Sequence, residues 1–279
     1  MPDKPSFTTR SRTAQRNDEI TWGDDESPWE DEIDVLDQAS VENGVVKVKR
    51  THAIETAETL SAGNHEYNNL LVDSGVTITA QGDYQTDENG EYGGVKIVAS
   101  GDITIQGTID ARGQGYPARY TGPGTPQDQQ YSSGAGYGGL GGGTYEWETS
   151  GYTYGASDVA NRLGSGSSSA AGGGSVWLVA GGDIIVNGTI LADGLDADHH
   201  GPSGGSIRLE ADGEIRGDGT VSATGGSVSD DQYSGGGGGG RILFLGTDNS
   251  TITADVSGGV QSASGYDAGE SGEDGTIVR

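Results

Sequence analysis

The chain has 279 residues, with 42 acidic and 15 basic side chains and a formal net charge of −27. It contains no cysteine, which excludes disulfides, metal thiolates and a thiol nucleophile. The negative charge argues against a nucleic-acid partner, because few cations are present to neutralise phosphates. No apolar run is long enough for a transmembrane helix, so we expect no membrane insertion.

The balance of charged residues indicates the solvent in which the protein works. Only four of the basic residues are lysines. A surface rich in Asp and Glu repels itself in dilute buffer, whereas multi-molar salt screens that repulsion. We therefore expect a halophilic protein, with an ordinary acidic protein as the alternative.

Residues 1–60 are expected to form an extended acidic N-terminal arm or anchor. The first twenty residues are polar and show no apolar stretch typical of a secretory signal. Residues 24–37 then hold eight acids, which are either a solvated charge run or part of a docking segment. The turn pair Asn43-Gly44 precedes a predicted strand at residues 45–48. The candidate anchor residues are Arg10, Arg12, Arg16, Trp22 and Trp29.

Three segments further along share a repeat in strict register. In each of them, 18 positions separate the first apolar residue from a closing glycine. A fixed period of about 20 residues is typical of a solenoid, in which each unit buries its apolar face on its neighbours. The units run from Val95 to Gly113, from Val176 to Gly194 and from Ile207 to Gly225.

Each unit is predicted to form three short strands. Apolar residues alternate with other residues, as at Val95, Ile97 and Ala99, and this period of two is typical of strands with one buried face. A Gly-Asp or Gly-Glu pair and a Gly-Thr step separate the strands, and these residue types favour turns. Three strands and three turns per unit predict one rung of a parallel β-helix.

Weaker copies of the repeat occur at residues 70–80 and 242–256, and a last strand is predicted at residues 275–278. The predicted fold is therefore all-β: a parallel β-helix (solenoid) of about five to six rungs, with long Gly/Tyr-rich loop insertions and the extended N-terminal arm. Residues 61–279 form the β-helix domain in this prediction.

The longest insertion covers residues 114–173 and holds seven of the twelve tyrosines. Tyrosine and glycine together are typical of binding loops, and aromatic rings also stack on sugars. Packing of these rings against the solenoid is the alternative. Because equivalent loops leave successive rungs at one corner, this insertion should cluster with residues 195–204 and 227–240. The candidate receptor-binding residues are Tyr116, Tyr120, Tyr131, Tyr137, Tyr145, Trp147, Tyr152 and Tyr154.

The second insertion holds the best candidate metal ligands, which are Asp196, Asp198, His199 and His200. Oxygen ligands suit Ca²⁺, and imidazoles suit other divalent ions. Their spacing matches no recognised ligand motif, so solvated loop residues are the alternative. We assign no catalytic residue, because acids occur throughout the chain and no nucleophile elbow or phosphate-binding loop has its required context.

The units GDITIQGTIDARGQG and GDIIVNGTILADG, with GGGGGGRILFL after them, resemble Gly-rich β-helical adhesin and tail-fibre-like proteins of tailed viruses. With the acidic composition, the chain is most similar to a virion protein of a haloarchaeal tailed virus. The resemblance implies a structural or host-binding part of a particle, without enzymatic activity and often a homotrimer or another ring. It also implies other virion proteins and a host surface glycan or glycoprotein as partners. The short chain favours a capsid turret, decoration or baseplate component.

Three functions follow from these observations. A virion protein that contributes to host-cell attachment agrees with the absence of an export signal. A cellular surface adhesin or S-layer-associated protein requires such a signal. A β-helix polysaccharide-degrading enzyme requires a carboxylate cluster along one face of the solenoid, and turnover of a glycan would reveal it.

Overall fold

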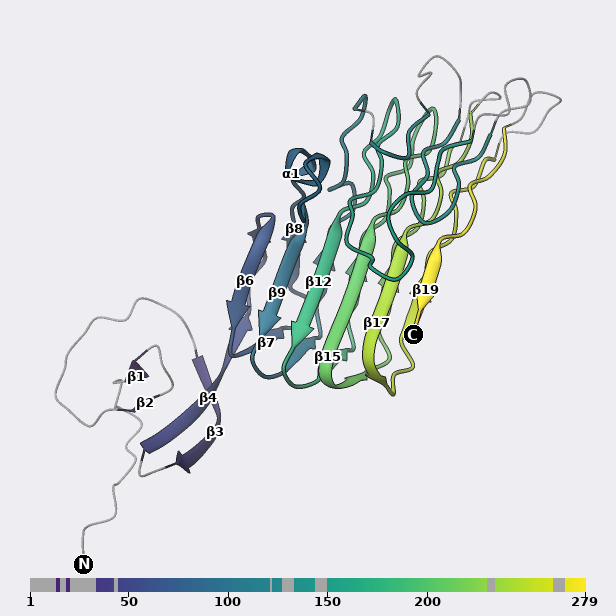
Figure 1. The fold of residues 1–279 in the computed structure, drawn as a ribbon. Helices are drawn as coiled ribbons and strands as arrows, with labels where there is room; N and C mark the ends of the chain where they lie inside the picture. The colour runs from purple at the N-terminus through teal and green to yellow at the C-terminus, as the bar shows by residue number, and fades with distance from the viewer. Residues whose placement is uncertain are drawn as a thin grey trace, which may run out of the picture.

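A computed structural model describes residues 14–15, 19–20, 34–42, 45–120, 122–126, 133–143, 150–229, 234–262 and 269–279, with side chains from Thr51 onward. Nearly all regular structure is β, and α1 (Tyr84–Glu88) is the one helix among these residues. From β4 onward, every strand pairs in parallel with a strand of a neighbouring repeat (Figure 1). The prediction of an all-β fold with parallel strands is confirmed.

The chain runs repeatedly through three strand positions, and we call each run a pass. The strands at the first position are β6 (Gly63–Tyr67), β9 (Val95–Ala99), β12 (Ser175–Ala180), β15 (Ser206–Arg216), β17 (Arg241–Asp248) and β19 (Thr276–Val278). Those at the second are β4 (Val45–Ile54), β7 (Asn69–Val72), β10 (Ile103–Ile105), β13 (Ile184–Val186) and the later halves of β15 and β17. Those at the third are β5 (Glu58–Leu60), β8 (Thr77–Ala80), β11 (Thr108–Asp110), β14 (Thr189–Leu191), β16 (Thr220–Ser222) and β18 (Thr253–Asp255).

The third position forms a separate six-stranded sheet, whereas the first and second join in one sheet. They join because β15 and β17 continue through the corner that the repeat predicts as a turn. In the other passes the corner separates two strands, as it does between β9 and β10. The prediction of three separate strands in every unit is therefore wrong for the Ile207 unit.

The repeat places equivalent residues opposite one another. Val95 pairs with Val176, which pairs with Ile207, although Val95 and Val176 are 81 positions apart in the chain. Inward positions stack in rows, such as Ile97, Leu178, Leu209 and Phe244, each at most 3% exposed. Burial of each such side chain contributes about 1.5–3 kcal/mol, so the stacked rows are the main stabilising element.

The repeated Gly-Asp corner has a function in stacking as well as in turning. The Asn69 side-chain oxygen accepts from the Asp102 N–H at 2.9 Å, and Asp102 Oδ1 accepts from the Asp183 N–H at 2.8 Å. Asp183 Oδ1 accepts from the Glu214 N–H at 2.8 Å. Each side chain thus satisfies a backbone donor of the next pass, which links the corners of four passes.

The stack begins earlier in the chain than the repeat predicts. After an antiparallel pairing with β3 (Asp34–Glu42), β4 pairs in parallel with β7 from Thr51 onward. Ile54 and Leu60 belong to the core at 4% and 7% exposure. Residues 51–60 are therefore part of the stack and not of an arm. The strand predicted at residues 45–48 lies within β4 and is confirmed.

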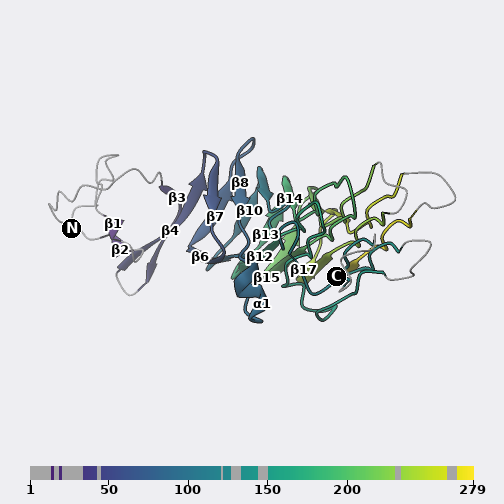
Figure 2. The same cartoon turned by 90° about the horizontal axis from the view of Figure 1, so that it is seen from above.

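The N-terminal end of the chain is described only as backbone. It contains β1 (Ala14–Gln15) and β2 (Glu19–Ile20), and β3 and β4 lie at one end of the stack (Figure 2). The candidate anchor residues Arg10, Arg12, Arg16, Trp22 and Trp29 lie outside the described residues.

The insertions gather at one edge of the stack, as predicted, and form a Gly-rich bundle (Figure 1). Within residues 235–240, N–H groups three positions apart donate to the same neighbouring segment. Those of residues 236 and 239 donate to residues 270 and 273, those of residues 237 and 240 donate to residues 226 and 223, and that of residue 238 donates to Ala135. A three-residue period with hydrogen bonds to separate neighbours is the geometry of polyproline II-like segments packed side by side. We define the bundle as the described parts of residues 113–126, 133–143, 150–174, 194–205, 223–229, 234–240 and 256–275.

Candidate binding surface

Two tyrosines are the most exposed aromatic side chains of the bundle. Tyr120 and Tyr152 are each 52% exposed. The ring of Tyr84, on α1, lies 5.1 Å from the Tyr120 ring, and the Tyr152 N–H donates to the Gly124 carbonyl at 3.1 Å. All three tyrosines therefore border the segment 117–126, and we call Tyr84, Tyr120 and Tyr152 the tyrosine surface.

The start of α1 fixes the position of Tyr84. Asp83 caps the helix by accepting from the Gln85 and Thr86 N–H groups at 3.1 and 3.4 Å. The Thr86 hydroxyl also donates to Asp83 at 2.7 Å, and this hydrogen bond is the largest cause of the lowered pKa of Asp83. The helix has five residues, so its placement depends on these contacts and on Asp87 rather than on helix propensity.

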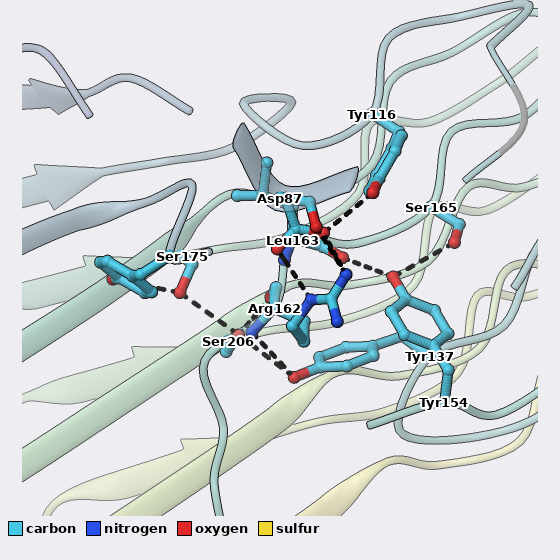
Figure 3. Close-up of polar contacts among 10 residues, drawn as sticks. Asp87, Tyr116, Tyr137, Tyr154, Arg162, Leu163, Ser165, Ser175 and Ser206 are labelled. Carbon is cyan, nitrogen blue, oxygen red and sulfur yellow. Dashed lines mark hydrogen bonds and ion pairs between the residues drawn. The ribbon is translucent and has the colours of Figure 1, made fainter. Parts of the chain in front are cut away.

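Asp87 connects α1 to the bundle through a buried ion pair (Figure 3). Its carboxylate is fully buried, and Arg162 donates to Oδ1 from Nε at 2.9 Å and to Oδ2 from Nη2 at 3.0 Å. Arg162 Nη2 also reaches the Asp87 carbonyl at 2.8 Å. Such a forked geometry compensates the cost of burying the charge.

Tyr116 joins this ion pair to the tyrosine surface. Its hydroxyl donates to Asp87 Oδ2 at 2.9 Å, and its ring lies 6.0 Å from the ring of Tyr84. Burial raises the pKa of the Tyr116 hydroxyl, with the nearby Asp87 charge as the next cause. The Tyr84 ring therefore lies beside Tyr116, whose position is fixed by its hydrogen bond to Asp87.

Tyr137 and Tyr154 extend the support toward the strands (Figure 3). Their rings lie 4.7 Å apart. The Tyr154 hydroxyl donates to the Leu163 carbonyl and accepts from Ser165, whereas the Tyr137 hydroxyl lies 3.3 Å from Ser206 Oγ at the start of β15. These contacts fix the segment around Arg162 against the stack.

The eight candidate receptor-binding aromatics thus have different environments. Tyr116 and Tyr137 are buried, and Tyr154 is half-buried with its hydroxyl paired, so these three have the packing role that was the alternative. Tyr120 and Tyr152 are exposed. The other three candidates, Tyr131, Tyr145 and Trp147, lie outside the described residues.

Sequence reasoning missed Tyr84, Asp87 and Arg162. Asp87 lies in the connection between β8 and β9, and Arg162 lies 75 positions later in the insertion at residues 114–173. Neither segment has a periodicity that relates the two residues, and acids are too common in this chain for one of them to stand out. The sequence therefore contained no signal for this pair.

The candidate metal ligands do not form a metal centre. Among the described residues, no group of three or more His, Asp or Glu side chains is placed to hold an ion. Asp196 Oδ1 instead accepts from the Ser227 N–H at 3.0 Å, and Asp198 and His199 are exposed. His200 lies at the end of this segment with a φ of 53°. The carboxylate of Asp196 therefore links passes, as the corner aspartates do.

Trp177, on the outer face of β12, is unavailable for stacking. Lys96 Nζ lies 3.6 Å from the centre of its ring system and the Arg208 guanidinium 4.3 Å from it. Since β9 and β15 flank β12, the two cations cover opposite faces of the ring. The indole N–H donates to Glu210 at 3.2 Å.

Comparison of the chain with protein-family models, with curated proteins and with solved structures gives no match. The part of the chain that the structure describes includes no helix long and apolar enough to cross a membrane. The tyrosine surface and its support are therefore the basis for a functional proposal.

Proposed function

We propose that this protein is a structural component of a virus particle that contributes to attachment to the host-cell surface in high salt. The observation that carries the proposal is the tyrosine surface: Tyr120 and Tyr152 are exposed, and the half-buried Tyr84 beside Tyr120 lies on a helix fixed by a buried ion pair. A rigid support lowers the ordering cost of binding, and tyrosine offers a large contact area at low entropy cost. A tail fibre, a baseplate part and a capsid turret or decoration are all compatible with this role.

We also propose that the stacked passes are a parallel β-helix. Support comes from the six in-register strands at the third position and from the inward rows of apolar residues. A solenoid suits a particle component, because its loops leave at one edge and its length scales with the number of passes.

Tyr131, Tyr145 and Trp147 remain proposed receptor contacts, and they lie outside the described residues. Gly142 and Gly143, which precede Tyr145 in the chain, belong to the bundle: the Gly142 N–H donates to the Gly236 carbonyl at 2.7 Å, and the Glu270 N–H donates to the Gly143 carbonyl at 2.9 Å.

The partners in this proposal are a host surface glycan or glycoprotein and other virion proteins. Aromatic rings stack on the apolar faces of sugars, which suits the exposed Tyr120 and Tyr152. The segment before Thr51 would contact the particle, and a homotrimer or another ring would multiply a weak affinity. The charge of −27 suits multi-molar salt, where self-repulsion is screened.

Binding of fluorescently labelled protein to intact haloarchaeal cells in multi-molar salt tests the proposal. We expect saturable binding that excess unlabelled protein competes. The double variant Tyr120→Ala/Tyr152→Ala should lose most of it, whereas Ile277→Ala, which removes an exposed apolar side chain of β19, should not. Absence of competed binding by the folded wild type, or equal binding by both variants, would contradict the proposal.

A further inference from the structure

Arg119 differs from the other arginines whose side chains the structure describes. Five of these seven pair with a carboxylate. A sixth, Arg241, is 5% exposed and donates to the carbonyls of Tyr137 and Tyr154. Arg119 is exposed, and no carboxylate of the described residues pairs with it. The chain has 42 acids for 15 basic residues, so an unpaired guanidinium is notable.

The backbone of Arg119 is also strained. Its φ is +69°, and the Tyr120 N–H donates to the Pro117 carbonyl at 3.2 Å, which closes a turn over residues 117–120. Only the third residue of this turn has positive φ, a position that favours Gly or Asn. The Arg119 N–H donates to the Ser167 carbonyl at 2.8 Å, so the bundle fixes this conformation. A strained non-glycine residue that forms no ion pair suggests a role beyond folding.

Arg119 precedes Tyr120 directly, and both side chains are exposed. Tyr120 is 52% exposed and its ring lies 5.1 Å from that of Tyr84. A guanidinium binds a carboxylate or a sulfate through two parallel hydrogen bonds, and tyrosine rings stack on sugar rings. One ligand class combines both features, namely a sugar that carries an anionic group.

We propose that Arg119, Tyr120 and Tyr84 form a binding site for an acidic saccharide, with the guanidinium on the anionic group and the rings on the sugar. This inference rests on the proposed attachment function and names the chemistry of the receptor. The carboxylate of a uronic acid and the sulfate of a sulfated sugar share that chemistry. Because the site is exposed, its preference for charge should weaken as salt increases.

Arg119→Gly separates binding from folding. Glycine removes the guanidinium and also the unfavourable conformation, so the variant should unfold at the same temperature as the wild type or higher. Arg112→Ala is the matched control, because it removes an exposed arginine that precedes the insertion and already pairs with Asp110. Tyr120→Ala tests the stacking part of the site.

Titration calorimetry would use three oligosaccharides of equal length: an alginate oligouronate, a sulfated dextran and neutral dextran. The experiment would use the lowest salt at which the protein remains folded. We expect the wild type and Arg112→Ala to prefer at least one acidic probe over neutral dextran by about tenfold or more. Arg119→Gly should lose this preference, and Tyr120→Ala should lower the affinity for every probe. The two acidic arms would identify the anionic group.

Three results would overturn the inference: a preference for acidic probes that survives in Arg119→Gly, equal affinity of the wild type for neutral dextran and both acidic probes, or no saccharide binding at all. If the wild type still bound cells in parallel assays, the attachment function would stand without this site. If the acidic preference held but no cells were bound, the site would stand and the attachment function would fail.

Discussion

At the scale of single residues, Asp87 determines whether the tyrosine surface exists. Its carboxylate is fully buried and accepts hydrogen bonds from Arg162 and Tyr116, which both belong to the insertion at residues 114–173. A buried charge is tolerated only where its partners replace the lost water. Breaking this contact therefore affects α1 and, with it, the position of Tyr84.

Asp87→Ala is expected to lower the free energy of unfolding by about 3 kcal/mol, because Arg162 would be left without its partner. Urea titration monitored by tyrosine fluorescence would measure the loss. The double variant Asp87→Leu/Arg162→Leu should be less destabilised than the single variant, since it leaves no unpaired charge. A single variant as stable as the wild type would show that the pair contributes nothing.

Buried tyrosines make stability dependent on alkaline pH. Burial raises the pKa of Tyr92, Tyr116, Tyr137 and Tyr154 above the ordinary value of 10.0. Because the pKa of these tyrosines is higher in the folded than in the unfolded state, their contribution to the free energy of unfolding is complete below about pH 10 and is lost as pH rises further. We expect the free energy of unfolding to fall above pH 10, and less steeply in Tyr154→Phe. Ionisation of every tyrosine near pH 10 without loss of structure would contradict this expectation.

At the scale of elements, the strands and the bundle segments pack in different ways. The strands bury alternating apolar side chains, whereas the bundle packs backbone against backbone. A Cβ on Gly237 would lie 1.9 Å from the Pro202 carbonyl oxygen, which no side chain can accommodate without a backbone shift. Glycines that the sequence pattern attributes to turns or low-complexity runs are therefore positions at which neighbouring backbones pack closely.

Gly237→Ala is expected to destabilise the protein by about 3 kcal/mol, because backbone atoms must move to admit the methyl group. Gly143→Ala is the matched control. Among the described residues, a Cβ on Gly143 would meet nothing closer than the Ser150 hydroxyl at 3.4 Å, so the stability of this variant should change by less than about 1 kcal/mol. Thermal unfolding compares the two variants, and equal melting temperatures would argue against backbone packing as the reason for glycine.

Local patterns explain which elements the sequence could predict. Alternation in Val95–Ala99 and Ser175–Ala180 revealed strands directly, because side-chain direction is a local property. In β6 the positions equivalent to Val95, Ile97 and Ala99 are Gly63, His65 and Tyr67, so the pattern was absent. Contacts between insertions, such as Asp87 with Arg162, depend on how distant loops pack and have no local signature.

At the scale of the whole molecule, the first and last described passes differ. In the first, β4 pairs in parallel with the stack from Thr51 onward, while β3 pairs with β4 in the antiparallel direction. In the last, Arg279 lies 4.2 Å from the Phe244 ring centre and donates to the Ile252 carbonyl at 2.8 Å. The guanidinium thus covers Phe244, which follows Leu209 in the inward row.

Truncation tests where the stack begins. Removal of residues 1–50 should leave a cooperative unfolding transition close to that of the full chain. Removal of residues 1–60 also deletes Ile54 and Leu60 from the core and the strand partners of β7 and β8. Two such side chains contribute about 3–6 kcal/mol, so the melting temperature should fall clearly. Equal stability of the two truncations would place residues 51–60 outside the folding unit.

The corner after β11 keeps the strand register independent of the length of the largest insertion. The chain leaves near Ala111 and returns at Gly174, whose N–H donates to the Ala111 carbonyl at 2.7 Å. β9 and β12, and likewise β11 and β14, remain in exact register across this excursion. Because the exit and return points already adjoin, the length of the segment between them can change without a shift in strand register. Its Gly-rich part bonds residues 201–204 and 235–240, so a replacement segment would have to supply the same backbone contacts to keep the bundle packed.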